Sequence, residues 1–308
     1  MKTAVAFLVY IRPESTKRVW ERIKAAKPPR LYLIADGPKT PDQAKTCKEV
    51  RSIIESGIDW DCELHKIYSD KNLGCAHRAT TGLDYVFEKE EQAIILEDDT
   101  LPDPTFFEFC EQLLDKYKDS KNVFHICGTN SYPEIFKDDI SYHLTSISNM
   151  WGWATWSRSW KHYDLSMNNW KNEDSTKFLR KWCLTESLRK SMLKMFDIHC
   201  NNADPWTWDY QWFYACWKNN GLSVIPSKNL VSNIGIGPDA THTKSKTKIS
   251  MFPKQIQKMY FPLVHPNSDM RNISIEKKYR QREEIPKVRR LKNYIKSLIN
   301  SFNQFIKN

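Results

Sequence analysis

The sequence has no apolar run long enough to cross a bilayer, no C-x-x-C pair and no internal repeat. A transmembrane helix needs about 20 predominantly apolar residues in a row, so the sequence predicts no membrane span. The eight cysteines stand apart, whereas zinc clusters and disulfide frameworks have closer, patterned spacing. We interpret them as reduced core thiols of a cytosolic protein. Neither G-x-G-x-x-G nor a P-loop occurs, so neither a dinucleotide cofactor nor a kinase-type phosphate cradle is supported.

The composition is that of a folded, basic protein. With 308 residues, 40% of them apolar, the chain can build one large α/β domain or two small ones, and global disorder is excluded. The net charge of +10 indicates an anionic partner such as a nucleotide, a nucleic acid or acidic lipid headgroups. The start, MKTAVAFLVYIRP, resembles a signal peptide only briefly, because Arg12 and Pro13 end its apolar run and no cleavage site follows. We predict a first β-strand there.

Short apolar runs alternate with helical patterns along most of the chain. Strand-like runs lie at residues 3–11, 30–35, 62–68, 93–96, 123–127 and 222–226, and helical periodicity lies at residues 42–56, 76–88, 105–117 and 176–195. A further helix is expected from a cap at Ser15 or Thr16 to about Ala26. Residues 138–150 are predicted to be irregular. The alternation predicts an α/β fold with a mostly parallel central sheet and helices on both faces.

The composition changes after about Lys244, where basic and polar residues replace the strand pattern. We expect a domain over residues 1–250, a basic linker over 251–285 and a basic amphipathic helix over 286–308. The apolar stripe of that helix runs from Val288 to Ile306. Such a helix can lie on an anionic membrane surface, or it can pack on the domain or on a second copy in a homo-oligomer.

The most informative stretch is AIILEDDTLP, residues 93–102. Four apolar residues lead straight into Glu97, Asp98 and Asp99, and Pro102 prevents the strand from simply continuing. Open α/β sheets bind ligands at the carboxyl ends of their strands. Adjacent carboxylates repel one another, and a hard divalent cation that carries substrate phosphates would explain three of them. The alternative is an acidic turn with solvated side chains.

Further polar side chains are expected near this strand end. Asp36 ends another predicted strand, where a carboxylate can bind a base or ribose, although Asp-Gly is also a simple turn. Arg12 and Arg78 can clamp a diphosphate in bidentate fashion, or can be solvated surface arginines.

Aromatic and loop residues supply the remaining candidates. Asp209, within WTWDYQW, can be a general base or an ordinary acid at a helix start. Trp151 and Trp153 can stack on sugar rings or form a tryptophan-rich hinge in the core. His242, after a loop with two glycines, can complete a metal shell, although a lone loop histidine commonly has no such role.

Taken together, these motifs resemble the nucleotide-sugar glycosyltransferases of the GT-A fold, most of all the N-acetylglucosaminyltransferase I group and related bacterial polysaccharide glycosyltransferases. The likeness covers residues 3–244 and rests on ILEDDTL followed by PTFFEF, on HRATTG, on GWATW, on Trp208-Asp209 and on the final Gly-x-x-x-x-His loop. The acidic motif with its Phe-Phe-Glu continuation is the most specific part. The tail after residue 250 has no counterpart in the family.

The resemblance implies a metal-dependent, inverting enzyme with one Rossmann-like domain of GT-A type and Mn²⁺, or Mg²⁺, as cofactor. It implies Asp209 as catalytic base, Asp99 and His242 at the metal, Arg12, Asp36, Arg78, Glu97 and Asp98 at the donor, and Trp151, Trp153 and Trp208 on the acceptor side. One departure is Tyr210, which follows Asp209 where the related animal enzymes carry a second carboxylate.

We therefore expect transfer of a sugar from a nucleotide-diphosphate donor, a UDP-sugar by the resemblance, to a glycan or lipid-linked saccharide in bacterial surface polysaccharide synthesis. The expected location is the cytoplasm or the inner face of the cell membrane. A catalytically inactive nucleotide-binding module is one alternative, against which the intact Asp99, Asp209 and His242 argue. A basic protein that binds nucleic acid or a membrane surface is another. No nucleic-acid partner is expected, because no recognised motif for one occurs.

Overall fold

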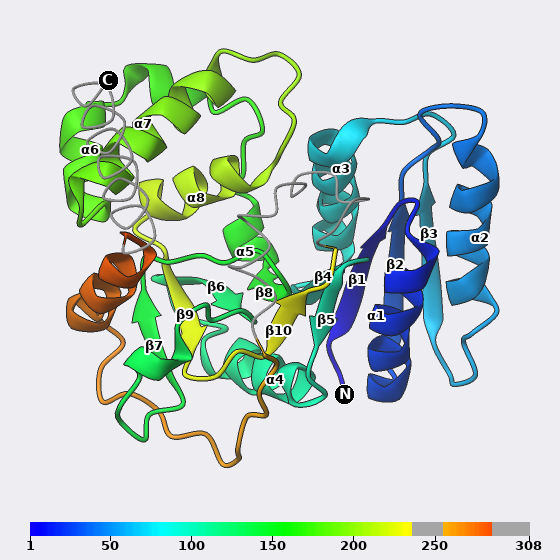
Figure 1. The fold of residues 1–308 in the computed structure, drawn as a ribbon, viewed down its shortest axis with the longest axis horizontal. Helices are drawn as coiled ribbons and strands as arrows, with labels where there is room; N and C mark the ends of the chain where they lie inside the picture. The colour runs from blue at the N-terminus through cyan, green and yellow to red at the C-terminus, as the bar shows by residue number, and fades with distance from the viewer. Residues whose placement is uncertain (236–254, 285–308) are drawn as a thin grey trace, which may run out of the picture.

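A computed structural model of the chain describes residues 1–235 and 255–284 (Figure 1). His242 and the predicted basic helix over residues 286–308 lie outside the described residues, so both stay predictions. Over the described ranges, every helix is too short or too polar to traverse a lipid bilayer.

A mixed sheet of eight strands forms the centre of the described part. It consists of β1 (Ala4–Val9), β2 (Arg30–Ala35), β3 (Glu63–Tyr68), β4 (Gln92–Glu97), β6 (Val123–Cys127), β7 (Tyr142–Thr145), β8 (Trp153–Trp156) and β9 (Leu222–Pro226). The order is β3-β2-β1-β4-β8-β6-β9-β7. Strands β3, β2, β1 and β4 are parallel, so their carboxyl ends meet at one edge. β8 runs antiparallel between β4 and β6, β9 is parallel to β6, and β7 is antiparallel to β9.

Helices cover both faces of this sheet (Figure 1). They are α1 (Pro13–Ala26), α2 (Gln43–Glu55), α3 (Gly74–Lys89), α4 (Thr105–Lys116), α5 (Ser157–Trp160), α6 (Ser175–Trp182), α7 (Glu186–Cys200) and α8 (Asp209–Lys218), with 3₁₀ turns at Pro133–Ile135 and Asn168–Asn172. α3 packs on β1, β2 and β4. Gly82 permits this approach, because a Cβ there would lie 2.5 Å from Ile34 Cγ2. The predicted α/β fold with a mostly parallel sheet is confirmed.

Three local expectations were wrong. α1 has no cap at Ser15 or Thr16 but begins at Pro13, whose missing N–H suits the first helical position. The stretch 138–150, predicted to be irregular, contains β7. The helical stretch 176–195 is two helices, because Thr185 interrupts it and caps α7 by accepting a hydrogen bond from the Leu188 N–H.

Residues 255–284, most of the predicted basic linker, pack against the second half of the sheet. Met259 and Tyr279 are buried, and residues 273–284 are helical. The Tyr279 hydroxyl accepts hydrogen bonds from the Ser131 N–H and from Asn149 Nδ2, both at 3.2 Å. The segment therefore contributes to the core, which the sequence did not indicate because basic and polar residues outnumber its buried ones.

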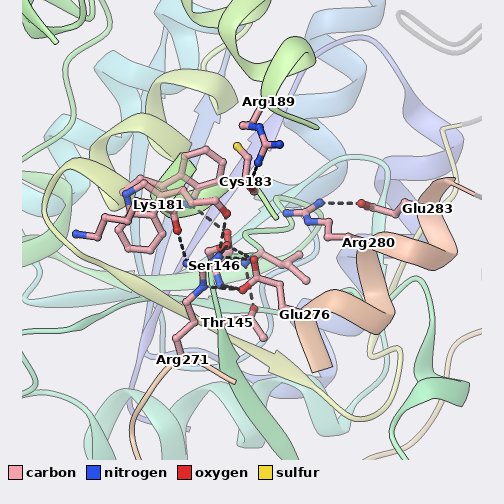
Figure 2. A network of polar contacts seen from close by, with 12 residues as sticks. Thr145, Ser146, Lys181, Cys183, Arg189, Arg271, Glu276, Arg280 and Glu283 are labelled. Carbon is pink, nitrogen blue, oxygen red and sulfur yellow. Dashed lines mark hydrogen bonds and ion pairs between the residues drawn. The ribbon is translucent and has the colours of Figure 1, made fainter. Parts of the chain in front are cut away.

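A buried ion pair holds this segment in place (Figure 2). Glu276, which has no exposed surface, accepts hydrogen bonds from Arg271 Nη2 at 2.6 Å and from Arg271 Nε at 2.9 Å. Ser146, just after β7, donates its hydroxyl at 2.6 Å and its N–H at 3.0 Å to the same carboxylate. Burial by itself raises the pKa of Glu276, but the bonds from Arg271 and Ser146 outweigh it and lower that pKa.

We expect Glu276→Ala to lower the free energy of unfolding by about 3 kcal/mol, because Arg271 then stays buried without its counter-ion. Arg282→Ala breaks a half-exposed pair with Glu134 and is the matched control, with an expected loss below about 1 kcal/mol. Since the folded-state pKa of Glu276 is lowered, its stabilisation is present above the unfolded pKa and is lost as the pH falls through the folded value. Urea unfolding at neutral and acidic pH measures both effects, and equal losses in the two variants would contradict the anchoring role.

Candidate active site

The carboxyl end of β4 carries the acidic residues of the AIILEDDTLP stretch. Glu97 ends the strand, Asp98 and Asp99 form a turn, and Thr100 opens β5 (Thr100–Pro102). The Thr100 hydroxyl accepts a hydrogen bond from the Glu97 N–H at 2.8 Å and donates one to the Glu97 carbonyl at 3.0 Å, which closes the turn. β5 then pairs with β10 (Val231–Asn233) outside the main sheet. Because Glu97 pairs with Leu8 of β1, the acidic turn, residues 97–99, lies beside the end of β1.

Arg12, shortly after β1, bridges the two aspartates of the acidic turn. Its Nη1 lies 2.9 Å from Asp98 Oδ1 and 2.7 Å from Asp99 Oδ2. The Tyr10 N–H donates to the other oxygen of Asp98 at 3.0 Å. The structure therefore places Arg12 at the acidic turn, and its contact with a diphosphate stays a proposal.

Three carboxylates crowded into the protein shift one another's proton affinity. Burial, followed by the charges of Asp99 and Asp98, raises the pKa of Glu97 to about 8. Burial raises the pKa of Asp98 to about 6 although Arg12 opposes it, and burial also raises the pKa of Asp99. No described residue donates a hydrogen bond to the Glu97 carboxylate. Such crowding opposes folding and is typical of functional sites.

Asp209 faces the acidic turn from the second half of the fold. It is the first residue of α8, and its Oδ1 accepts hydrogen bonds from the Thr207 hydroxyl at 2.6 Å and from the Tyr210 N–H at 3.0 Å. Its charge contributes to raising the pKa values of Glu97 and Cys75. Among the described residues, none donates a hydrogen bond to Oδ2 of Asp209. Thr207 and Tyr210 therefore fix the orientation of this carboxylate.

The amino-terminal end of α3 forms a third side of the site. Cys75 lies there with part of its surface exposed, although the surrounding protein atoms still desolvate its thiol. This desolvation, followed by the charges of Glu97, Asp209 and Asp99, raises the thiol pKa. Tyr163 connects α3 with the start of α8: its hydroxyl accepts from Thr80 at 3.3 Å and donates to the Trp208 carbonyl at 3.2 Å. Sequence analysis had grouped Cys75 with the core thiols. Its position at a helix start after a loop was the signal that could have separated it.

Asp36 and Arg78 lie at the end of β2 and on α3. Both oxygens of Asp36 are engaged: Oδ1 accepts from the Gly37 and Leu73 N–H groups at 2.9 Å, and Oδ2 accepts from Asn72 Nδ2 and the Gly74 N–H at 3.0 Å. Asp36 therefore positions the loop that leads into α3. Arg78 is 8% exposed, and its Nε has no hydrogen-bond partner among the described residues. Burial lowers the pKa of Arg78, and an anion bound at the unpaired Nε would offset this cost of burial.

The three predicted acceptor-side tryptophans occupy different environments. Trp153, in β8, has no exposed surface, and Trp208 is 3% exposed. Their rings stack on each other at 5.4 Å between centroids. Trp151 is half-buried. Trp153 and Trp208 therefore present no free ring face, and they belong to the core cluster around Trp212.

Asp99, the residue expected to bind the metal, has both carboxylate oxygens engaged by other side chains. Arg12 bonds to its Oδ2, and Asn233 Nδ2 donates to its Oδ1 at 3.4 Å. Gly235 lies so close that a Cβ there would be 2.3 Å from Oδ2. Within residues 1–235 and 255–284, no group of three or more His, Cys, Asp or Glu side chains could hold a metal ion. A divalent cation on Asp99 would therefore need most of its ligands from substrate phosphates and water, and its binding here stays a proposal.

No protein-family model matches the chain, and no curated protein matches its sequence. A mannosyltransferase from Pyrobaculum calidifontis, in complex with GDP-Man and Mn²⁺, is similar with a TM-score of 0.39 and 17% identity, over 52% of this chain and 46% of that chain. The match thus spans about half of the mannosyltransferase. Galactosyltransferase LgtC, in complex with donor and acceptor sugar analogues, has a TM-score of 0.35 and 11% identity over 70% of both chains. UDP-glucose pyrophosphorylase, complexed with UDP-glucose, has a TM-score of 0.32 and 11% identity over 53% of this chain and 79% of that chain. Similarity at this level does not assign an activity.

We expect Glu97→Gln to stabilise the protein at alkaline pH. Because the folded-state pKa of Glu97 is raised, its favourable contribution is complete below the unfolded pKa and is lost as the pH rises through about 8. The uncharged amide avoids this loss, so the variant should melt about 2 °C or more above the wild type at pH 9, and the two should converge near pH 5. Glu91→Gln, at an exposed position just before β4, is the control. Thermal melting across this range measures the difference, and a variant that is less stable at pH 9 would contradict the crowding.

Proposed function

We propose that the chain is a glycosyltransferase of GT-A type that moves a sugar from a nucleotide-diphosphate donor to a saccharide or lipid-linked acceptor. The observation that supports this most is the convergence of Arg12, the acidic turn and Asp209 at one edge of the sheet. This edge holds the carboxyl ends of the parallel strands, where α/β folds bind nucleotides. A guanidinium group that can bind a diphosphate and a carboxylate that can accept the proton of an attacking hydroxyl then lie on facing elements.

The donor's diphosphate is assigned to the two arginines. Negative charge grows on the leaving diphosphate as the bond to the sugar breaks, and guanidinium groups stabilise that charge. The buried Arg78 has an unpaired Nε, and Arg12 already lies between Asp98 and Asp99. A divalent cation on Asp99 would neutralise part of the same charge. Glu97 and Asp98 remain the candidates for the donor sugar and ribose.

Asp36 and His242 have less direct support in this proposal than the residues above. The oxygens of Asp36 are used by the 72–74 loop, so any contact with the nucleobase would run through that loop. His242 is retained as a metal or diphosphate residue on the resemblance alone, because it lies outside the described residues. Uridine is proposed as the base on the same ground.

Asp209 is assigned the role of general base. Thr207 and Tyr210 hold Oδ1, which leaves Oδ2 to take the proton of the acceptor hydroxyl as its oxygen attacks the anomeric carbon. The new glycosidic bond forms as the bond to the diphosphate breaks. Attack on the side opposite the leaving group inverts the anomeric centre.

The acceptor is proposed to be a growing bacterial surface glycan at the cytoplasmic face of the membrane. The net charge of +10 and the basic amphipathic helix predicted over residues 286–308 support a location at an anionic surface. An inactive nucleotide-binding module would bind the donor without turnover, so hydrolysis of a UDP-sugar separates that alternative from an enzyme.

Asp99→Asn should abolish Mn²⁺-stimulated nucleotide release from UDP-sugars and weaken Mn²⁺ binding in the presence of UDP, because a neutral amide is a poorer ligand for a hard cation. The fold should survive, since Arg12 keeps its bond to Asp98. Asp115→Asn, which changes an exposed carboxylate on α4, is the control. Nucleotide release and calorimetric titration with Mn²⁺ measure the two effects, and unchanged Mn²⁺-dependent release in Asp99→Asn would remove Asp99 from the metal site.

Asp209→Asn should lower turnover by about 10²–10⁴-fold with donor binding nearly unchanged, because the amide keeps the shape but accepts no proton. Glu186→Gln is the matched control, since Glu186 is likewise a carboxylate at the first position of a helix, α7, and is exposed. Steady-state kinetics with a UDP-sugar donor measures turnover, and UDP titration measures binding. If binding collapses and turnover does not, Asp209 is a binding residue and the base lies elsewhere.

A further inference from the structure

We propose that Trp206 is the platform on which the pyranose ring of the acceptor lies, an inference that rests on the proposed function and locates its acceptor subsite. Trp206 stands in the loop between α7 and α8, shortly before Asp209, and is 46% exposed. A single exposed aromatic residue needs no function by itself. The support beneath this ring and its place beside Asp209 distinguish it.

The Trp206 ring is supported from the protein side. Its centroid lies 4.4 Å from that of His199, at the end of α7, with 43° between the rings. His199 has no exposed surface and stacks in turn on Tyr210 at 5.4 Å and 24°. Tyr210 follows Asp209 and donates its N–H to that carboxylate at 3.0 Å. One stack of rings therefore connects the exposed indole with the proposed base. A ring that is already immobilised loses little conformational entropy when a ligand covers it.

The partly exposed indole suits a sugar and not a further core contact. The neighbouring Trp208 and Trp153 are buried against each other, whereas Trp206 keeps 46% of its surface exposed. The apolar face of a pyranose can cover an indole while its hydroxyl groups stay in water. A sugar on Trp206 would then present a hydroxyl toward Oδ2 of Asp209, which no described residue occupies.

The opposite wall of this subsite comes from α3. His77 Nε2 lies 3.3 Å from Oδ1 of Asp204, which belongs to the same loop as Trp206. This contact joins the loop to the end of α3 that carries Cys75. The charge of Asp209 contributes to raising the pKa of the Cys75 thiol, so the two residues lie near each other. Leu73, just before α3, is 39% exposed on the same side. An acceptor ring would therefore lie between Trp206 and the start of α3.

The test compares Trp206→Ala with Trp206→Tyr, which keeps a flat ring, and with Tyr260→Ala, which removes a 70% exposed aromatic residue from the C-terminal segment. The probes are p-nitrophenyl pyranosides of glucose, galactose and N-acetylglucosamine, with UDP-sugar donors and Mn²⁺. Nucleotide release is recorded with and without each glycoside, so that water hydrolysis normalises every variant. We expect the KM for the best glycoside to rise about tenfold in Trp206→Ala, to stay within about threefold in Trp206→Tyr and to be unchanged in Tyr260→Ala.

Several outcomes would overturn the platform. An unchanged KM in Trp206→Ala would do so, as would a fall in kcat alone or equal losses in the Ala and Tyr variants. Donor hydrolysis that no pyranoside accelerates would overturn the acceptor subsite and leave the donor chemistry intact. An absence of all nucleotide release would instead contradict the proposed function. In that case, a tryptophan-fluorescence titration with the same glycosides decides, since a response in the wild type that is lost in Trp206→Ala supports the subsite and an identical response, or none, refutes it.

Discussion

The site depends on one interaction, the bridge from Arg12 to Asp98 and Asp99. Buried carboxylates are tolerated only when they are paired, and these two share a single guanidinium. Arg12 follows β1 and the aspartates follow β4, so the bridge requires the two strands to be adjacent and parallel, with Leu8 paired to Glu97. Among the described residues, Glu97 has no such partner. Burial and the charges of Asp99 and Asp98 raise the pKa of its carboxyl, so the ionised form of Glu97 destabilises the folded protein.

The second half of the fold brings the groups that complete the site. β8 inserts antiparallel next to β4, and its Trp153 packs into the aromatic cluster on which the start of α8 rests. Tyr163 ties that start to α3, which sets Asp209 across from the acidic turn. Farther away, Glu276 fixes the C-terminal segment to Ser146 after β7. The candidate site therefore lies where the two halves of the sheet meet, and it needs both.

Several strands of the sheet could be predicted from the sequence. β2, β6 and β9 have the expected bounds, because each is an apolar run with a clear break at its end. β7 was not predicted, because Tyr-His-Leu-Thr is only four residues long and two of them are polar, whereas the fold buries all four side chains. The roles of the tryptophans were equally hidden, since a buried and an exposed tryptophan look alike in sequence. The packing buries Trp153 and Trp208 and leaves Trp206 partly exposed.

By itself the sequence determined the strand–helix alternation of the first 127 residues and the position of Glu97, Asp98 and Asp99 at a strand end. Periodicity, apolar runs and chain breaks are local properties that neighbouring residues establish. Only the tertiary structure decided that Arg12 pairs with the two aspartates and that Asp209 faces them. These juxtapositions join residues that are distant in the chain, and their free energy depends on how the whole core packs and on which charges it can bury together.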